Sequence, residues 1–175
     1  ALDAFFDSLD EAGALRLSPA TTSRAEAERW LKRAGGGELD GVVAKRLDEP
    51  YQSGERAMVK VKCLRTADCV VGGFRYATNS RLIGSLLLGL FNEQGKLDHV
   101  GFTSGISDAE RPALTRKVEA LKGGSGFTGD APGGPSRWST ERSNDWEPLK
   151  LKLVAEVQYD HVSGNRFRHG TKFVR

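Results

Sequence analysis

Apolar residues recur at helical spacing in two stretches of the chain, and both stretches carry signals for their ends. Ser23 followed by Glu26 has the spacing of a capping box, in which both side chains satisfy the first free amides of a helix. That helix is predicted to stop at the glycine run 35–37. A second helix is predicted over 108–122, where Pro112 disfavours an early start because of its fixed ring and missing N–H.

Short apolar runs bounded by turn residues predict the strands of the chain. They are expected over 40–46, 58–62, 69–76, 86–91, 97–103, 154–162 and 166–174. From residue 69 onward, the order is three strands, one helix and two strands. This is the order of a five-stranded OB barrel, whose face commonly binds nucleic acid. The pair Gly72-Gly73 in the first of these strands predicts a bulge or a bend.

The first two predicted strands bring charged side chains close together in the sequence. Asp40 stands at the entrance of the first strand and Lys45 at its exit. In the second strand Lys60 and Lys62 share one face, about 7 Å apart, while the valines between them face the other side and can pack in a core. A carboxylate that can hold a metal and lysines that can hold a phosphate together indicate a nucleotide or polyphosphate site.

Lysines on a strand also have a purely structural use. On an edge strand they discourage unwanted pairing with another chain, and Lys60 with Lys62 taken alone favours this interpretation. The presence of Asp40 and Lys45 just upstream favours the binding site instead.

Three segments resemble motifs IV and V of ATP-dependent DNA ligases. They are the run Asp40–Arg46, the dipeptide Pro50-Tyr51 and the run Met58–Lys62. The resemblance is strongest to the bacterial repair type, namely ligase C and the ligase domain of ligase D, and it covers nearly the whole chain. Those enzymes have a nucleotidyltransferase domain followed by an OB-fold domain.

The resemblance implies an α+β fragment of a nucleotidyltransferase domain, followed by a five-stranded OB-fold β-barrel with one helix. Residues 1–66 are assigned to the C-terminal part of the nucleotidyltransferase (adenylation) domain with motifs IV and V, and residues 67–175 to the OB-fold domain. A change of composition at 64–68 places the boundary there. The resemblance also implies that the OB domain swings about this segment, closing in turn on ATP and on DNA.

By resemblance, Asp40 stands where the family has an acidic metal-binding residue, often Glu, and Lys60 and Lys62 fall on the motif V lysines that contact the nucleotide phosphate. Lys45 completes the predicted cofactor-binding set, and the implied cofactors are ATP and Mg²⁺ (or Mn²⁺). The family's nucleophile is the lysine of a Lys-x-Asp-Gly motif, which does not occur in this sequence. The chain is therefore expected to lack a catalytic nucleophile and to be inactive in self-adenylation.

The resemblance implies a part in DNA repair. The complete enzyme would charge a lysine with AMP, move the AMP to a DNA 5′-phosphate, and join the 3′-hydroxyl with release of AMP. Nicked or broken double-stranded DNA is the implied partner, with end-joining repair proteins as further candidates. Because the nucleophile motif is absent, a non-catalytic OB-fold module that only holds DNA stays open as the alternative.

Basic residues near the domain boundary and at the C-terminal end are candidates for contact with the DNA backbone. They are Arg65, Arg75, Arg166, Arg168, Lys172 and Arg175. Each taken alone also fits a solvated surface charge, and the last four also fit a frayed cationic terminus. The net charge is only +3 and the pI is near 9.0, so nucleic-acid binding would depend on such local patches.

The remaining composition predicts an intracellular protein without a membrane segment. Cys63 and Cys69 are too few for a disulfide framework and are expected to be reduced thiols. The longest apolar run, 82–91, is far shorter than the ~20 residues that a spanning helix needs. The expected location is the bacterial cytoplasm, in association with the nucleoid.

Overall fold

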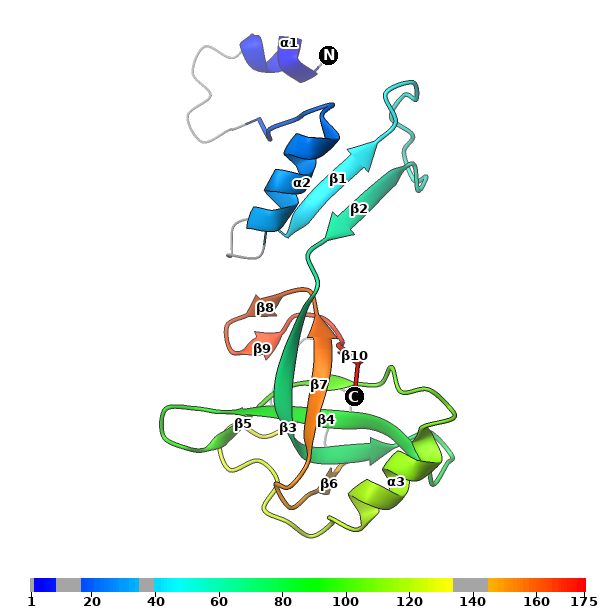
Figure 1. Ribbon diagram of the computed structural model, residues 1–175, viewed down its shortest axis with the longest axis vertical. Coiled ribbons are helices and arrows are strands. Elements are labelled where there is room, and N and C mark those ends of the chain that lie inside the picture. Colours follow the sequence, from blue (N-terminus) through cyan, green and yellow to red (C-terminus); the bar gives the residue numbers. More distant parts are fainter. Residues whose placement is uncertain (1, 9–16, 35–39, 134–144) are drawn as a thin grey trace. The chain divides into compact units, whose positions relative to one another are not determined.

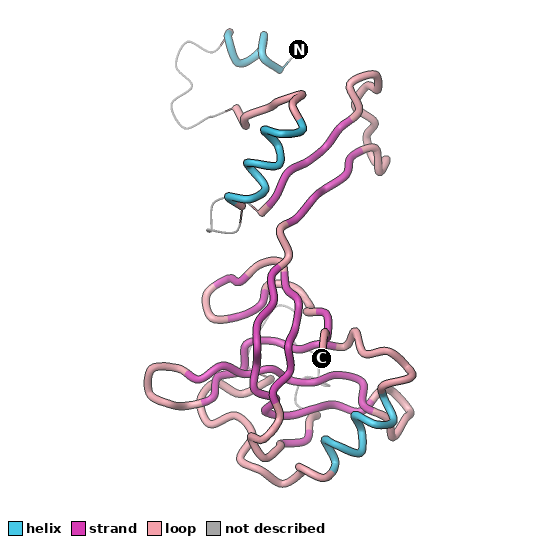
Figure 2. The backbone as a smooth tube through the Cα atoms, in the orientation of Figure 1, coloured by secondary structure: helices cyan, strands magenta, loops and turns pink. Residues whose placement is uncertain are grey.

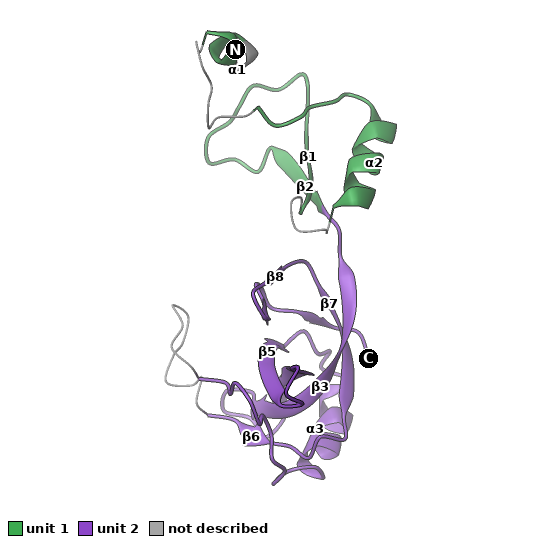
Figure 3. Ribbon diagram, turned by 90° about the vertical axis from the view of Figure 1, so that its left-hand side faces the viewer, with its two compact units in different colours: residues 1–61 green, residues 62–175 purple. Residues whose placement is uncertain are grey.

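The computed structural model describes residues 2–8, 17–34, 40–133 and 145–175. The chain forms two compact units, Ala1–Val61 and Lys62–Arg175 (Figure 3). The described part of the first unit combines helices, strands and long loops, whereas strands dominate the second unit (Figure 2). None of the helices in these described ranges is long and apolar enough to cross a membrane.

The first unit contains α2 (Arg24–Arg33), which begins at its predicted capping residue. The Ser23 hydroxyl accepts a hydrogen bond from the Glu26 amide at 3.4 Å. The Glu26 carboxylate accepts the Thr21 hydroxyl at 2.7 Å, so a neighbouring residue replaces the reciprocal half of the predicted capping box. The helix ends before the glycines at 35–37, which lie outside the described residues.

A two-stranded sheet accompanies this helix. The other elements are α1 (Leu2–Asp7), β1 (Gly41–Lys45) and β2 (Met58–Lys62). β1 pairs with β2, and α2 packs against β1 (Figure 1). All of β2 is exposed, including Val59 at 64% and Val61 at 39%. The expectation that these valines pack in a core is therefore wrong for this chain, because one helix beside two strands cannot enclose both faces of β2.

The second unit consists mainly of antiparallel strands. Its elements are β3 (Arg65–Tyr76), β4 (Ile83–Phe91), β5 (Leu97–Thr103), α3 (Arg111–Glu119), β6 (Glu147–Pro148), β7 (Val154–Tyr159), β8 (Val162–Ser163), β9 (Arg166–Phe167) and β10 (Lys172–Phe173). The main sheet has the order β10-β7-β3-β4-β5, with β6 also paired to β3, and these pairings are antiparallel. A separate hairpin joins β8 to β9.

The predicted run of three strands followed by one helix is observed, but a closed five-stranded barrel is not confirmed. The main sheet has two ends, β10 and β5. A parallel bridge joins Thr103 to Thr171 near these ends, and the Thr103 hydroxyl donates to the Thr171 carbonyl at 2.9 Å. The fold class that the structure supports is a mostly antiparallel β-sheet protein with few helices.

Long-range pairing moves two strand boundaries away from their predicted positions. β3 begins at Arg65 instead of residue 69, because residues 65–68 pair with 156–159 of β7. The predicted strand 166–174 is divided into β9, which pairs with β8, and β10, which pairs with β7. β7, which pairs with the start of β3 and with β10, is adjacent to neither of them in the sequence, so local pattern alone does not reveal these two pairings. β9 instead pairs with the neighbouring β8 in a short hairpin.

The glycine pair on β3 makes room for aromatic side chains. The register of β3 against β4 shifts between Val71 and Gly73, which confirms the predicted bulge. A Cβ on Gly72 would lie 2.6 Å from the Phe127 ring, and a Cβ on Gly73 would lie 2.5 Å from the Trp146 ring. Both aromatic rings therefore pack directly on the strand and cover this part of the sheet.

α3 packs against β4 and is shorter than the predicted 108–122. It starts at Arg111 with Pro112 in its first turn, where the missing proline N–H has no cost. Val118 is fully buried, and the Thr115 hydroxyl accepts the Ile83 amide at 3.0 Å. The helix thus satisfies a backbone donor at the start of β4 and also covers the core.

Candidate nucleotide and nucleic-acid sites

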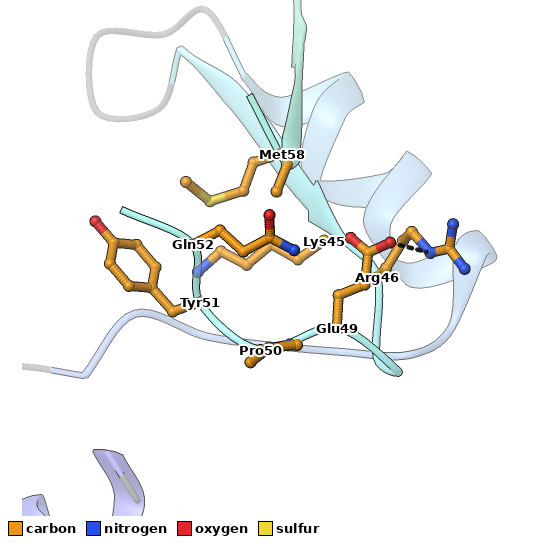
Figure 4. Close-up of a pocket in the computed structure, with 8 residues that line it drawn as sticks. Lys45, Arg46, Glu49, Pro50, Tyr51, Gln52 and Met58 are labelled. Atoms are coloured by element: carbon orange, nitrogen blue, oxygen red, sulfur yellow. Dashed lines mark ion pairs between the residues drawn. The ribbon is translucent and has the colours of Figure 1, made fainter. Parts of the chain in front are cut away.

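A pocket of about 120 Å³ lies in the first unit, around the connection between β1 and β2 (Figure 4). Its lining residues are Lys45, Arg46, Glu49, Pro50, Tyr51, Gln52, Ala57 and Met58. Pockets for drug-sized ligands usually measure ~300–1,000 Å³. This pocket therefore has room for a small part of a nucleotide, such as a phosphate group, and not for the whole molecule.

Two basic residues line this pocket, but their charges are not equally available. Arg46 lies 2.8 Å from the Asp48 carboxylate and 3.2 Å from that of Glu49. The hydrogen bond with Arg46 lowers the pKa of Asp48, so both partners stay charged and offset one another. Lys45 forms no ion pair with any described residue. It is therefore the better placed of the two to hold an anion.

The structure does not gather the predicted nucleotide-binding set around the pocket. Lys45 lines the pocket, whereas Asp40, Lys60 and Lys62 do not. Asp40 is exposed and directly precedes β1, and Lys60 is exposed within β2. Across the described ranges, no group of three or more His, Cys, Asp or Glu side chains is placed to hold a metal ion.

Lys62, the last residue of β2, belongs to the second unit and is engaged there. Its Nζ lies 2.5 Å from Oδ2 of Asp160, and Nδ1 of His169 lies 3.1 Å from the same carboxylate. The hydrogen bond from Lys62 lowers the pKa of Asp160 to about 2 against the opposing effect of burial, and His169 adds to the shift. The ammonium group of Lys62, which was predicted to contact a phosphate, is thus paired with the carboxylate of Asp160.

The six predicted DNA-contacting residues are spread over several elements. β3 carries Arg65 and Arg75, β9 carries Arg166, β10 carries Lys172, and Arg168 and Arg175 lie outside the strands. All are exposed apart from Arg75, which is half-buried. Arg166, Arg168 and Lys172 do not share one strand, contrary to the strand predicted over 166–174, because residues 168–171 separate β9 from β10.

Arg175 has a charged partner and Arg166 has a neutral one, so the positive charge is offset only at Arg175. Nε of Arg175 lies 2.7 Å from the Glu156 carboxylate, so its charge is offset. Nη2 of Arg166 lies 2.7 Å from Nδ1 of His99. A guanidinium only donates hydrogen bonds, so Nδ1 is the acceptor.

His99 is a buried residue of β5, with 8% of its surface exposed. The pKa of His99 is lowered to about 4, mainly by burial and also by the charges of Arg166 and Arg75, while a hydrogen bond with the Gly101 backbone opposes the shift. The ring is therefore neutral near pH 7. It packs edge-to-face on Phe127 at a centroid distance of 5.2 Å, which holds its orientation.

Sequence reasoning missed His99 and Asp160 as partners of basic residues. Arg166 and His99 are separated by 67 positions, and Lys62 and Asp160 by 98. No local spacing links such residues, because they meet only through the pairing of distant strands. The signal that could reveal such pairs is correlated change of the two positions among homologous sequences, which a single sequence does not contain.

Comparison with known proteins places the chain in a family. Residues 79–175 match the family model for the ATP dependent DNA ligase C terminal region. The chain therefore belongs to the ATP-dependent DNA ligase family. The resemblance inferred from motifs IV and V is confirmed.

Individual relatives are bacterial ligases of the repair type. The chain is 44% identical over 151 residues to DNA ligase C1 of Mycolicibacterium smegmatis, covering 83% of this chain and 42% of the relative. It is 39% identical over 174 residues to DNA ligase C of Mycobacterium tuberculosis, covering 92% and 49%. The ligase domain of M. tuberculosis LigD superposes with a TM-score of 0.54 at 31% identity, covering 76% and 43%. The chain spans about half the length of the curated relatives it matches.

Proposed function

We propose that this chain is part of an ATP-dependent DNA ligase that seals DNA strand breaks in repair, through lysyl-AMP and DNA-adenylate intermediates. The observation that carries the proposal is the family match over residues 79–175. Motifs IV and V in the first 62 residues support it, because they lie before the matched region and belong to the same family. The alternative of a non-catalytic OB-fold module is not favoured by relatives that are named ligases.

The nucleotide-binding roles are part of this proposal. Lys45 and Lys60 would contact ATP phosphates, and Lys62 would join them when it leaves Asp160. Asp40 fits a Mg²⁺ (or Mn²⁺) ion, since Mg²⁺ is usually held by one or two carboxylates together with waters and substrate phosphates. Such an ion neutralises phosphate oxygens and orients them. The lysines of this chain hold the phosphate chain and offset the charge that develops at the α-phosphorus.

The proposal also covers the domains and the DNA. Residues 1–66 would be the end of the adenylation domain, and residues 67–175 an OB-fold domain that follows a DNA backbone. Support comes from the strand and helix order of the second unit and from its exposed basic residues. The predicted DNA contacts are Arg65, Arg75, Arg166, Arg168, Lys172 and Arg175. The proposed substrate is nicked or broken duplex DNA in the bacterial nucleoid, with end-joining proteins as partners.

A chimeric enzyme tests the function. This sequence replaces the matching segment of M. smegmatis DNA ligase C1, and the chimera is assayed for the lysyl-AMP adduct and for sealing of a nicked duplex. We expect both activities. A chimera that folds, as judged by a cooperative thermal transition, but neither forms the adduct nor seals would contradict the proposal.

The same chimera tests the role of Lys62. Lys62→Ala is expected to slow formation of the lysyl-AMP adduct by ~10²–10³, because a charge-stabilising donor is removed from the phosphate site. Lys117→Ala, at an exposed position on α3, is the matched control and should leave the rate unchanged. Near-normal adduct formation by Lys62→Ala would return this lysine to a structural role as the partner of Asp160.

A further inference from the structure

The contact between Arg166 and His99 differs from the ion pairs made by other basic residues of the second unit. Lys62 and Arg175 face carboxylates, at 2.5 Å from Asp160 and 2.7 Å from Glu156. Arg166 faces an imidazole at 2.7 Å and, among the described residues, no carboxylate. Its guanidinium is therefore held in place while its positive charge is not offset.

The imidazole is itself held by its surroundings. His99 is 8% exposed, and Phe127 packs edge-to-face on its ring at 5.2 Å. Phe127 in turn packs on Trp146 at 5.5 Å and fills the space above Gly72. The lowered pKa of His99 keeps the ring neutral, so Nδ1 remains an acceptor at neutral pH. His99 thus lies at one end of a row of packed rings, and its Nδ1 atom accepts a hydrogen bond from the exposed Arg166.

We propose that His99 is a positioning residue, which presents the guanidinium of Arg166 to a phosphate of the DNA backbone. This inference rests on the proposed function, in which Arg166 is one of the DNA contacts. An arginine that is ordered before binding loses less side-chain entropy when it contacts the phosphate, so the affinity for DNA is higher. A carboxylate in place of His99 would order the arginine equally well but would repel the phosphate.

Fluorescence anisotropy with a labelled nicked duplex over a range of salt concentrations tests the inference on the 175-residue chain. Arg166→Ala should weaken binding and reduce the slope of log K against log salt by about 0.9, because one phosphate contact is lost. His99→Leu should weaken binding about 3- to 10-fold with the slope unchanged, because the contact is still made but without prior ordering. In the Arg166→Ala background, His99→Leu should have no further effect.

Two controls separate positioning from general loss of stability. His99→Asn keeps an acceptor oxygen near the position of Nδ1 and should restore most of the affinity that His99→Leu loses. Val118→Ala removes buried methyl groups of α3 and lowers stability away from the rings that hold His99, so its DNA affinity should equal that of the wild type. If Val118→Ala and His99→Leu weaken DNA binding alike, the positioning role is overturned.

A measurement on the unmodified chain covers the case in which His99→Leu fails to fold. The NMR order parameter of the Arg166 Nε–H bond should be clearly higher than that of Arg168, which is exposed and makes no side-chain hydrogen bond with a described residue. Equal order parameters would overturn the inference.

The outcomes distinguish the inference from the function on which it rests. If the wild-type chain does not bind DNA, both the proposed function and the inference about His99 are contradicted. DNA binding that Arg166→Ala weakens and His99→Leu leaves unchanged removes the inference alone. If Arg166→Ala instead weakens binding of ATP, measured by competition, and leaves DNA binding unchanged, Arg166 serves a nucleotide and the inference is also overturned.

Discussion

The partner of each basic side chain decides what that side chain contributes to binding. Arg46 and Arg175 are next to carboxylates, and Lys62 is held by Asp160. Arg166 has a neutral partner, and Lys45 forms no ion pair with a described residue. The number of lysines and arginines in the sequence therefore overstates the positive charge available to a nucleic acid, and residues with neutral partners matter most.

Asp160 makes the stability of the second unit depend on pH in a defined direction. Its pKa is about 2 in the folded chain, below the value of ~3.9 in an unfolded chain. The stabilisation is present above the unfolded value and is lost as the pH falls through the folded value. Compared with Asp160→Asn, the wild type should be more stable by about 1–2 kcal/mol at pH 6, allowing for partial exposure.

Urea unfolding at several pH values measures this difference. The advantage of the wild type over Asp160→Asn should shrink between about pH 4 and pH 2. Glu93→Gln, at an exposed turn position, is the control and should follow the wild type throughout. A difference that stays constant down to pH 2 would show that the ion pair does not contribute through the charge of Asp160.

Strand and helix ends were predictable where a local residue sets them. Ser23 starts α2, Pro112 lies in the first turn of α3, and the glycine pair marks the bulge in β3. The start of β3 at Arg65 and the separate strand β10 were not predictable, because hydrogen bonds to β7 decide them. A strand ends where its partner ends, and β7 is adjacent to neither of these segments in the sequence.

Because side chains pack closely on β3, replacing Gly73 by alanine should reduce stability more than the same replacement at Gly170. Gly73→Ala should lower the free energy of unfolding by about 1–3 kcal/mol, because the added methyl group would lie 2.5 Å from Trp146 and 2.9 Å from the Glu147 carbonyl. Gly170→Ala, with nothing within 4 Å of the added atom, is the matched control and should change stability by less than ~0.5 kcal/mol. Urea denaturation compares them, and equal losses would contradict the packing described for Trp146.

At the scale of the whole molecule, the two units divide between Val61 and Lys62. The segment predicted as a hinge, 64–68, lies mostly in β3, where residues 65–68 pair with β7. Cys63 and Leu64 are the residues between β2 and β3, so a motion of one unit against the other would use them. The domain assignments and this motion stay predictions.

The chain by itself should not form a covalent AMP adduct. Its 175 residues contain no Lys-x-Asp-Gly motif, and the remaining lysines lack that setting. After incubation with α-labelled ATP and Mg²⁺, a denaturing gel should show no labelled band at 19 kDa, whereas the chimera described above should be labelled. A labelled band from the isolated chain would mean that another lysine can serve as the nucleophile.

The sequence by itself determined the family, the order of the main strands and α3, and the identity of the candidate phosphate-binding residues. It could do so because motifs and capping residues are local, and each carries its chemistry within a few positions. Only the tertiary structure decided that Lys62 faces Asp160, that His99 holds Arg166, and that the valines of β2 are exposed. These properties depend on which distant strands pair and on what covers a face, and hydrogen bonding and packing across the whole sheet settle both.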